Sequence, residues 1–209
     1  MGALLAYGDS NTWGLKPGLR PYQRYPKEIR WTGILQKKAQ HVRVLEEGLC
    51  GRTTVYEDRT RAGRKGINTL PEILAQQDTV DSAILMLGTN DCKEAYGATS
   101  NDIGSGIEQC LEALESRVSR DRILLISPIA LGKDVWKPEK DPEFSPQSVE
   151  TSKALKATYE EIARRRGVHF LAASDYVVAD EADDEHLNET GHRIFANVVY
   201  QKLKEMEVL

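Results

Sequence analysis

The chain has 209 residues and a formal net charge of −4, from 28 basic and 32 acidic side chains. This length suits one domain with a sizeable core, which we expect to span residues 1–209. The basic residues are dispersed, so nucleic acid is not an expected partner, and no apolar run is long enough to cross a membrane. The short apolar run near the start has no basic residue before it, so we do not expect a signal peptide.

The three cysteines, Cys50, Cys92 and Cys110, are odd in number and contain no Cys-x-x-Cys pair. Disulfide and metal sites are therefore poor interpretations, and we expect a reducing compartment, the cytoplasm, with no metal or other cofactor. A thiol nucleophile is an alternative at Cys50 or Cys92, but small buried packing residues are the preferred interpretation.

The first structural signal is an apolar run over residues 3–7, which predicts a short buried strand. Gly8 lets the backbone bend after it, and Asp9 and Asn11 can hydrogen-bond nearby backbone to hold a tight turn. Ser10 lies in this turn, at the carboxyl end of the first strand, where open α/β sheets bind their ligands. Its hydroxyl is the candidate nucleophile.

The remaining apolar patterns alternate between strands and helices along the chain. They predict helix 31–40, strand 42–46, helix 70–77, strand 82–87, helix 103–118, strand 122–127, helix 148–166, strand 168–171 and helix 189–204. The alternation indicates a three-layer α/β/α fold with a five-stranded parallel sheet. A flavodoxin-like order, 2-1-3-4-5, is the natural prediction. Residues 128–146 hold four of the eight prolines and are long enough to form a lid or pocket wall.

The polar loops at the carboxyl ends of the strands carry the residue types that an acyl-transfer site needs. His186 has an ordinary pKa near neutrality and can take the proton of Ser10. Asp183 can bond the other ring nitrogen and so fix the tautomer of the imidazole. Oxyanion donors would be the amides of Ser10 and Gly51 and the side-chain NH2 of Asn90.

Several residues are rival or supporting candidates. His192 is an alternative base, but its place inside the last helix favours a structural role. Asp91 is expected to orient the loop after the third strand. Trp13 and Trp136 are candidate pocket walls, although large aromatic residues are core at least as often.

Four short motifs resemble the SGNH (GDSL-type) hydrolase family, in the right order and over nearly the whole chain. They are Gly8-Asp9-Ser10, Gly48-x-x-Gly51, Gly88-x-Asn90-Asp91 and Asp183-x-x-His186. Each motif alone is weak, whereas all four together are specific. The residues at 9–14, 30–33, 46–49, 52–54 and 86–91 are similar to bacterial arylesterases and acyltransferases of this family.

The resemblance implies a serine carboxylic-ester hydrolase that acts on short-chain acetyl or aryl esters through an acyl-enzyme. Acyl transfer to another acceptor is implied as a second activity, and the partner is a small-molecule ester. Two alternatives stay open: a carbohydrate acetylesterase on the same fold, and a non-catalytic small-molecule binding domain that kept the fold.

The chain also departs from the arylesterase pattern. Asn11 stands where those relatives have leucine, and Leu15 where they have tryptophan. Residues 128–146 show little resemblance, and the relatives use this region to build oligomers, so a homo-oligomer stays open. Asp184 replaces a glycine, and its extra negative charge is expected to raise the pKa of His186.

Overall fold

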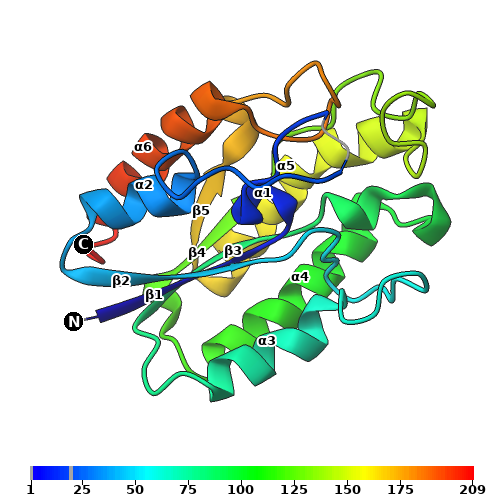
Figure 1. Ribbon diagram of the computed structural model, residues 1–209. Helices are drawn as coiled ribbons and strands as arrows, with labels where there is room; N and C mark the ends of the chain where they lie inside the picture. Colours follow the sequence, from blue (N-terminus) through cyan, green and yellow to red (C-terminus); the bar gives the residue numbers. More distant parts are fainter. Residues whose placement is uncertain (1, 19–20) are drawn as a thin grey trace.

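The computed structural model describes residues 2–18 and 21–209. A five-stranded parallel sheet forms its centre, with helices on both faces (Figure 1). The strands are β1 (Gly2–Gly8), β2 (Val42–Gly48), β3 (Ser82–Met86), β4 (Ile123–Ser127) and β5 (His169–Ala172). Their order is β2-β1-β3-β4-β5, which confirms the predicted flavodoxin-like arrangement.

The described residues also form six α-helices, five between successive strands and one after the last strand. They are α1 (Ser10–Trp13), α2 (Trp31–Lys38), α3 (Gly66–Ala75), α4 (Ser100–Glu115), α5 (Pro146–Arg166) and α6 (Glu189–Glu205). Single 3-10 turns occur at η1 (Asn90–Cys92), η2 (Glu94–Tyr96), η3 (Arg120–Arg122) and η4 (Ala173–Asp175).

Three helix starts differ from the sequence prediction, and one of them is that of α5, which begins at Pro146 rather than at residue 148. Helix α3 begins at Gly66 and carries Pro71 in its interior, whereas the predicted helix began at residue 70. Helix α4 begins at Ser100 because Thr99 and Asp102 form a reciprocal capping box, a signal that precedes the apolar periodicity.

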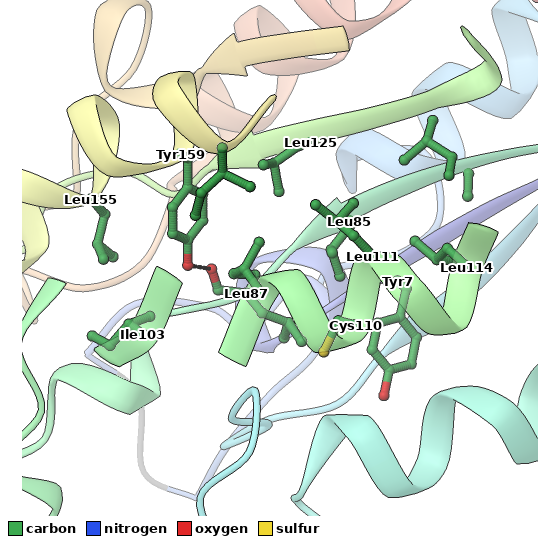
Figure 2. Close-up of a cluster of buried hydrophobic side chains, with 14 of the residues drawn as sticks. Tyr7, Leu85, Leu87, Ile103, Cys110, Leu111, Leu114, Leu125, Leu155 and Tyr159 are labelled. Carbon is green, nitrogen blue, oxygen red and sulfur yellow. Dashed lines mark hydrogen bonds between the residues drawn. The ribbon is translucent and has the colours of Figure 1, made fainter. Parts of the chain in front are cut away.

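The core lies on both faces of the sheet because successive strand residues point to opposite sides. Leu5 and Tyr7 of β1 pack with α3, α4 and α5, whereas Leu4 and Ala6 pack with α2 and α6. Figure 2 shows the first of these clusters, in which the hydroxyl of Tyr159 donates to the carbonyl oxygen of Leu87 at 2.9 Å. This bond holds the backbone just after β3.

The strand register brings three loops to one edge of the sheet. Gly8, the last residue of β1, lies opposite Gly48 of β2 on one side and Met86 of β3 on the other. The loops that follow these strands therefore leave the sheet as neighbours. They carry Ser10, Gly51 and Asn90, the residues that the sequence motifs single out.

Among the helices of the described residues, none combines the length and the apolar character needed to cross a membrane.

Candidate active site

The candidate nucleophile is the first residue of the short helix α1. Asp9 caps this helix, and its side chain accepts a hydrogen bond from the backbone N–H of Asn11 at 3.0 Å. Gly14 ends the helix in the left-handed conformation, with φ of 86°. The predicted turn is therefore a capped single helical turn, and it presents Ser10 at the end of β1 with only 3 % of its surface exposed.

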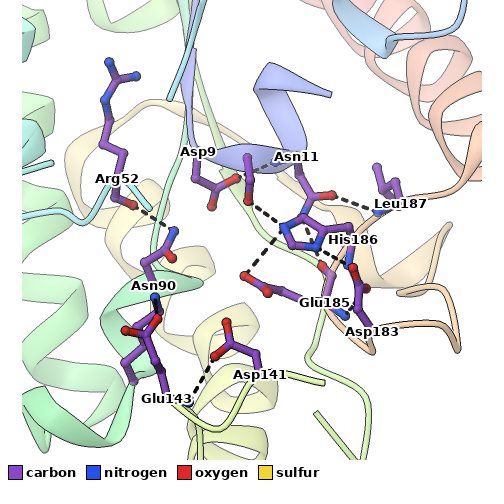
Figure 3. Close-up of polar contacts among 12 residues, drawn as sticks. Asp9, Asn11, Arg52, Asn90, Asp141, Glu143, Asp183, Glu185, His186 and Leu187 are labelled. Carbon is purple, nitrogen blue, oxygen red and sulfur yellow. Dashed lines mark hydrogen bonds and ion pairs between the residues drawn. The ribbon is translucent and has the colours of Figure 1, made fainter. Parts of the chain in front are cut away.

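Three side chains form a hydrogen-bonded relay. The Oγ atom of Ser10 lies 2.9 Å from Nε2 of His186, and Nδ1 of the same ring lies 2.8 Å from Oδ2 of Asp183 (Figure 3). With the carboxylate as acceptor, Nδ1 carries the proton and Nε2 is free to accept the serine hydroxyl proton. This is the arrangement that a serine nucleophile and its base require.

The loop before α6 is shaped by Asp183 itself. Its Oδ1 atom accepts the backbone N–H groups of Glu185 at 3.0 Å and His186 at 2.9 Å. The tight turn requires φ of 58° at Asp184, a left-handed conformation that glycine adopts without a Cβ penalty. Glycine, which the resemblance to arylesterases leads one to expect here, would adopt this conformation freely, and the turn fixes the carboxylate of Asp183 beside Nδ1 of the imidazole ring.

Asn11 joins the nucleophile turn to the histidine loop, a role that sequence reasoning missed. Its side-chain NH2 donates to the carbonyl oxygen of Glu185 at 3.2 Å, and its side-chain oxygen accepts the N–H of Leu187 at 2.9 Å. The two backbone groups flank His186. The signal of this role in the sequence is that Asn11 replaces the leucine of the arylesterase pattern. Unlike leucine, the side chain of asparagine can both donate and accept hydrogen bonds.

Two of the three candidate oxyanion donors, Gly51 and Asn90, lie on the loops beside the nucleophile turn. The NH2 group of Asn90 uses one N–H to reach the carbonyl oxygen of Arg52 at 3.1 Å, and its second N–H is left for another acceptor. Gly51 has φ of 80°. Asp91 joins the same loops as predicted, since its Oδ1 atom accepts the N–H of Thr54 at 2.8 Å.

Arg52 is a buried cation. It lies in one of the segments that resemble the family, but the sequence predicted no role for it. Its Nη1 atom donates to the carbonyl oxygen of Gly8 at 2.8 Å and also to that of Glu47. Its guanidinium lies over the ring of Tyr7, 4.1 Å from the centroid. Arg52 thus binds together the ends of β1 and β2 and presents the carbonyl that orients Asn90.

The charges around His186 favour its protonated form. Burial alone would lower the pKa of the imidazole, but the Glu185 carboxylate and the hydrogen bond and charge of Asp183 outweigh it and raise the pKa to about 9. Burial tends to raise the pKa of Asp183, yet its bonds to His186 hold that pKa lower, at about 2. Burial also raises the pKa of Glu185, to about 7.

The expectation that Asp184 raises the pKa of His186 is wrong. The carboxylate of Asp184 turns to another loop, where it accepts Nζ of Lys140 at 2.6 Å and the N–H of Asp134 at 3.1 Å. The next residue, Glu185, supplies the additional charge, with Oε1 3.7 Å from Nε2 of His186.

The rival candidates lie elsewhere. His192 is fully buried in α6, where Nδ1 accepts the backbone N–H of Trp31 at 3.4 Å, and burial lowers its pKa to about 4. Burial raises the pKa of the Cys50 thiol to about 11, which disfavours a thiolate. The indole N–H of Trp136 donates to a nearby backbone carbonyl, and the ring of Trp13 lies under the guanidinium of Arg24, so their place in a substrate pocket stays a prediction.

A small cavity of about 70 Å³ lies beside the relay. Its walls include His186, Glu185 and Asp141, together with Leu15 from the nucleophile side. Asp141 belongs to the loop at 128–146, so part of this loop forms a wall of the cavity. Nowhere in residues 2–18 and 21–209 do three or more His, Cys, Asp or Glu side chains gather in a way that could hold a metal ion.

Comparisons with known proteins show which family the chain resembles. The model of the GDSL-like lipase/acylhydrolase family matches residues 6–194. A carbohydrate acetylesterase from Sinorhizobium meliloti has a similar structure, with a TM-score of 0.88 and 30% identity over 99% of this chain and 100% of that one. The aryl esterase of M. smegmatis also has a TM-score of 0.88, with 28% identity over the same shares of the two chains. A search of curated protein sequences finds no significant match.

The family model covers most of the chain and includes all four motifs that carry the relay and the candidate oxyanion donors. The resemblance inferred from the sequence is thereby confirmed. The chain belongs to the GDSL-like lipase/acylhydrolase family and is a carboxylic ester hydrolase of the SGNH type.

Proposed function

We propose that this enzyme hydrolyses small esters of short acyl groups through an acyl-enzyme on Ser10. In the first half of the reaction, Oγ of Ser10 attacks the ester carbonyl carbon while its proton passes to Nε2 of His186. The tetrahedral intermediate collapses as the bond to the alcohol oxygen breaks, and His186 returns the proton to that oxygen. A water molecule then repeats the sequence on the acyl group, which leaves as the acid.

The observation that carries the proposal is the relay from Ser10 to Asp183. Both of its hydrogen bonds, at 2.9 and 2.8 Å, lie within the range of about 2.6–3.2 Å that proton transfer between nucleophile and base requires. Asp183 stays ionised because its pKa is held at about 2, and it can stabilise the imidazolium that forms during each half-reaction.

We assign the oxyanion site to the N–H groups of Ser10 and Gly51 and the second N–H of Asn90. Three neighbouring loops supply these donors, and a bond to the Arg52 carbonyl orients the amide of Asn90. Donors held in place before the reaction stabilise the charge that grows on the carbonyl oxygen, and this is usually the largest single contribution to catalysis.

The short acyl group is supported by the related structures, which are an aryl esterase and a carbohydrate acetylesterase. A carbohydrate acetylesterase is therefore the second candidate, and the carboxylates of Glu185 and Asp141 in the cavity beside His186 favour it, because they can accept sugar hydroxyls. Acyl transfer follows from the same mechanism when an alcohol replaces the water in the second half-reaction. A non-catalytic binding domain would have no need of the relay.

The test is hydrolysis of 4-nitrophenyl acetate by the wild type and by Ser10→Ala. We expect a burst of nitrophenolate from the wild type and loss of nearly all activity in a variant whose circular dichroism is unchanged. A serine-reactive organophosphate should add its mass to the peptide that contains Ser10. Near wild-type turnover by Ser10→Ala would refute the proposal.

A further inference from the structure

The side chain of Glu185 is a buried carboxylate next to the reacting atoms. It is 6 % exposed, and no donor in the described part of the chain bonds its side-chain oxygens. Its close charged neighbour is the ring of His186, at 3.7 Å from Oε1 to Nε2. Buried carboxylates are normally hydrogen-bonded or paired, so this one requires an explanation.

Two lysines near Glu185 form ion pairs with other carboxylates. Lys93, whose charge reaches Glu185, forms a close ion pair with Glu143. Lys140, on the wall of the same cavity, is bound to Asp184 at 2.6 Å. Neither ammonium group therefore neutralises Glu185 by direct contact.

The imidazole of His186 is not a lasting partner either. It must be neutral at Nε2 to take the proton of Ser10, and at that moment it presents no positive charge to Glu185. Among the described residues, the catalytically competent state of the enzyme thus leaves the buried carboxylate of Glu185 without a donor or a positive charge in direct contact.

The position of Glu185 indicates which part of a substrate would reach it. Figure 3 shows its side chain pointing into the space between His186 and Asn90, with Asp141 beyond it. During acylation Nε2 must protonate the alcohol oxygen, so that oxygen lies within hydrogen-bond distance of Nε2. Since Oε1 of Glu185 is 3.7 Å from the same nitrogen, it lies within reach of groups on the carbon atoms next to the departing oxygen.

We propose that Glu185 accepts a hydrogen bond from the alcohol portion of the substrate. The enzyme then prefers esters whose alcohol carries a donor next to the ester oxygen, either a hydroxyl of a polyol or sugar or the N–H of an ammonium group. This inference rests on the proposed function, because it requires acylation of Ser10 by an ester. Glu185 is in that case a specificity residue, and its bond to the alcohol operates in both the ground state and the transition state.

The experiment compares acetates of equal shape that differ only in the donor. Glycerol 1-acetate is paired with 2-methylbutyl acetate, in which methyl groups replace both hydroxyls. 2-(Dimethylamino)ethyl acetate, protonated at neutral pH, is paired with 3-methylbutyl acetate, in which CH replaces N–H. The ratio of kcat/KM within each pair is measured for the wild type, Glu185→Gln, Glu185→Leu and the control Glu181→Gln. Glu181 is an exposed acid of the same loop.

We expect the wild type and Glu181→Gln to prefer the donor-bearing member of at least one pair by roughly tenfold to a hundredfold, as for a hydrogen bond to a charged group. Glu185→Leu should bring both ratios close to one. Glu185→Gln separates the two sources, since its amide oxygen still accepts a hydroxyl but carries no charge to attract an ammonium group. A hydroxyl preference that survives partly in Glu185→Gln indicates a polyol, and an ammonium preference lost in it indicates an amino alcohol.

Equal rates within both pairs for the wild type would overturn the inference, as would a preference that persists in Glu185→Leu. Each ratio is taken within one variant, so a change in the pKa of His186 does not affect it. Acetate release from the hydrocarbon esters, abolished by Ser10→Ala, shows separately that the proposed function holds. If no ester is cleaved by the wild type, the proposed function itself has failed.

Discussion

The side-chain oxygen of Asn11 accepts the backbone N–H of Leu187 at 2.9 Å, across 176 positions of the sequence. Together with the bond from its NH2 group to Glu185, this contact sets the distance between the turn that carries Ser10 and the loop that carries His186. The hydrogen bond between nucleophile and base is thus held by a residue that takes no part in the reaction.

Asn11→Ala should therefore lower kcat by roughly tenfold to a hundredfold, because small displacements of reacting groups are costly, while KM changes less. It should also destabilise the protein by about 1–3 kcal/mol, because the N–H of Leu187 is left buried without an acceptor. Steady-state kinetics and urea unfolding measure the two effects. The control is Thr12→Val in the same turn, whose hydroxyl has no hydrogen-bond partner among the described residues and should be dispensable. Equal kcat for Asn11→Ala and Thr12→Val would contradict the positioning role.

The pH dependence of the free enzyme provides a second prediction. His186 must be neutral to act as base, and its pKa is raised to about 9 by Glu185 and Asp183 against the effect of burial. The active fraction therefore grows with pH, and kcat/KM for a neutral ester should rise about tenfold per pH unit from pH 6 until it levels near the raised pKa. Glu185→Gln should move the midpoint to lower pH. Rates for Ser10→Ala supply the background of spontaneous hydrolysis, and a profile that is level from pH 6 upward would refute the assignment.

Asn90 tests the oxyanion site. Its free N–H can donate to an oxygen whose charge grows only in the transition state, so Asn90→Ala should lower kcat by roughly 10²–10³-fold with little change in KM. Asn90→Asp should be at least as harmful, since it replaces a donor by a negative charge. A comparison of kcat and KM with 4-nitrophenyl acetate decides the matter. An unchanged kcat for Asn90→Ala would remove this residue from the site.

The two buried histidines near the site should respond differently. His186→Ala should lose activity as Ser10→Ala does, because it removes the base of the relay. His192→Ala should keep most of kcat and lose stability, since Nδ1 of His192 accepts the N–H of Trp31 in the core between α2 and α6. Activity at saturating substrate and the thermal midpoint separate these effects. The reverse order of kcat would identify His192 as the base.

Much of the fold follows from local patterns in the sequence. The continuous apolar run of β3 indicates a strand covered on both faces, and the alternation of strands and helices indicates a parallel sheet. Local patterns do not determine the strand order, which was predicted by analogy with flavodoxin-like folds. This order in turn predicts that Ser10, Gly51 and Asn90 lie at one edge of the sheet. The start of α3 at Gly66 did not follow, because it depends on contacts such as the hydroxyl of Tyr7 donating to the Gly66 carbonyl.

In the candidate site, too, local motifs predict some features, whereas others depend on contacts between distant segments. The residues of the relay occur in short motifs and were predicted, whereas the contacts of Asn11 and Arg52 join distant segments and leave little local trace. The charge near His186 shows why: Asp184 and Glu185 are adjacent acids, and only the backbone conformation of the turn decides which one faces the ring. With φ of 58° at Asp184, its carboxylate turns to Lys140 and that of Glu185 turns inward.

Asp184 allows the strain in this turn to be separated from the contacts of its side chain. Both Asp184→Gly and Asp184→Ala remove the bonds to Lys140 and to the N–H of Asp134. Alanine must also adopt the left-handed conformation, which costs roughly 1–2 kcal/mol, whereas glycine pays a smaller entropic cost in folding. The glycine variant should therefore be the more stable of the two, by up to about 1 kcal/mol. Urea midpoints at equal m-values measure the difference.

Both Asp184 variants should keep the pH midpoint of kcat/KM of the wild type, because the carboxylate of Asp184 faces away from His186. A shift to lower pH in Asp184→Gly comparable to that in Glu185→Gln would show that Asp184 does act on the base. If alanine were instead as stable as glycine, the turn would have to relax out of its left-handed conformation. Asp183 would then lose the two backbone N–H groups that hold it under the ring, and kcat of Asp184→Ala would fall as well.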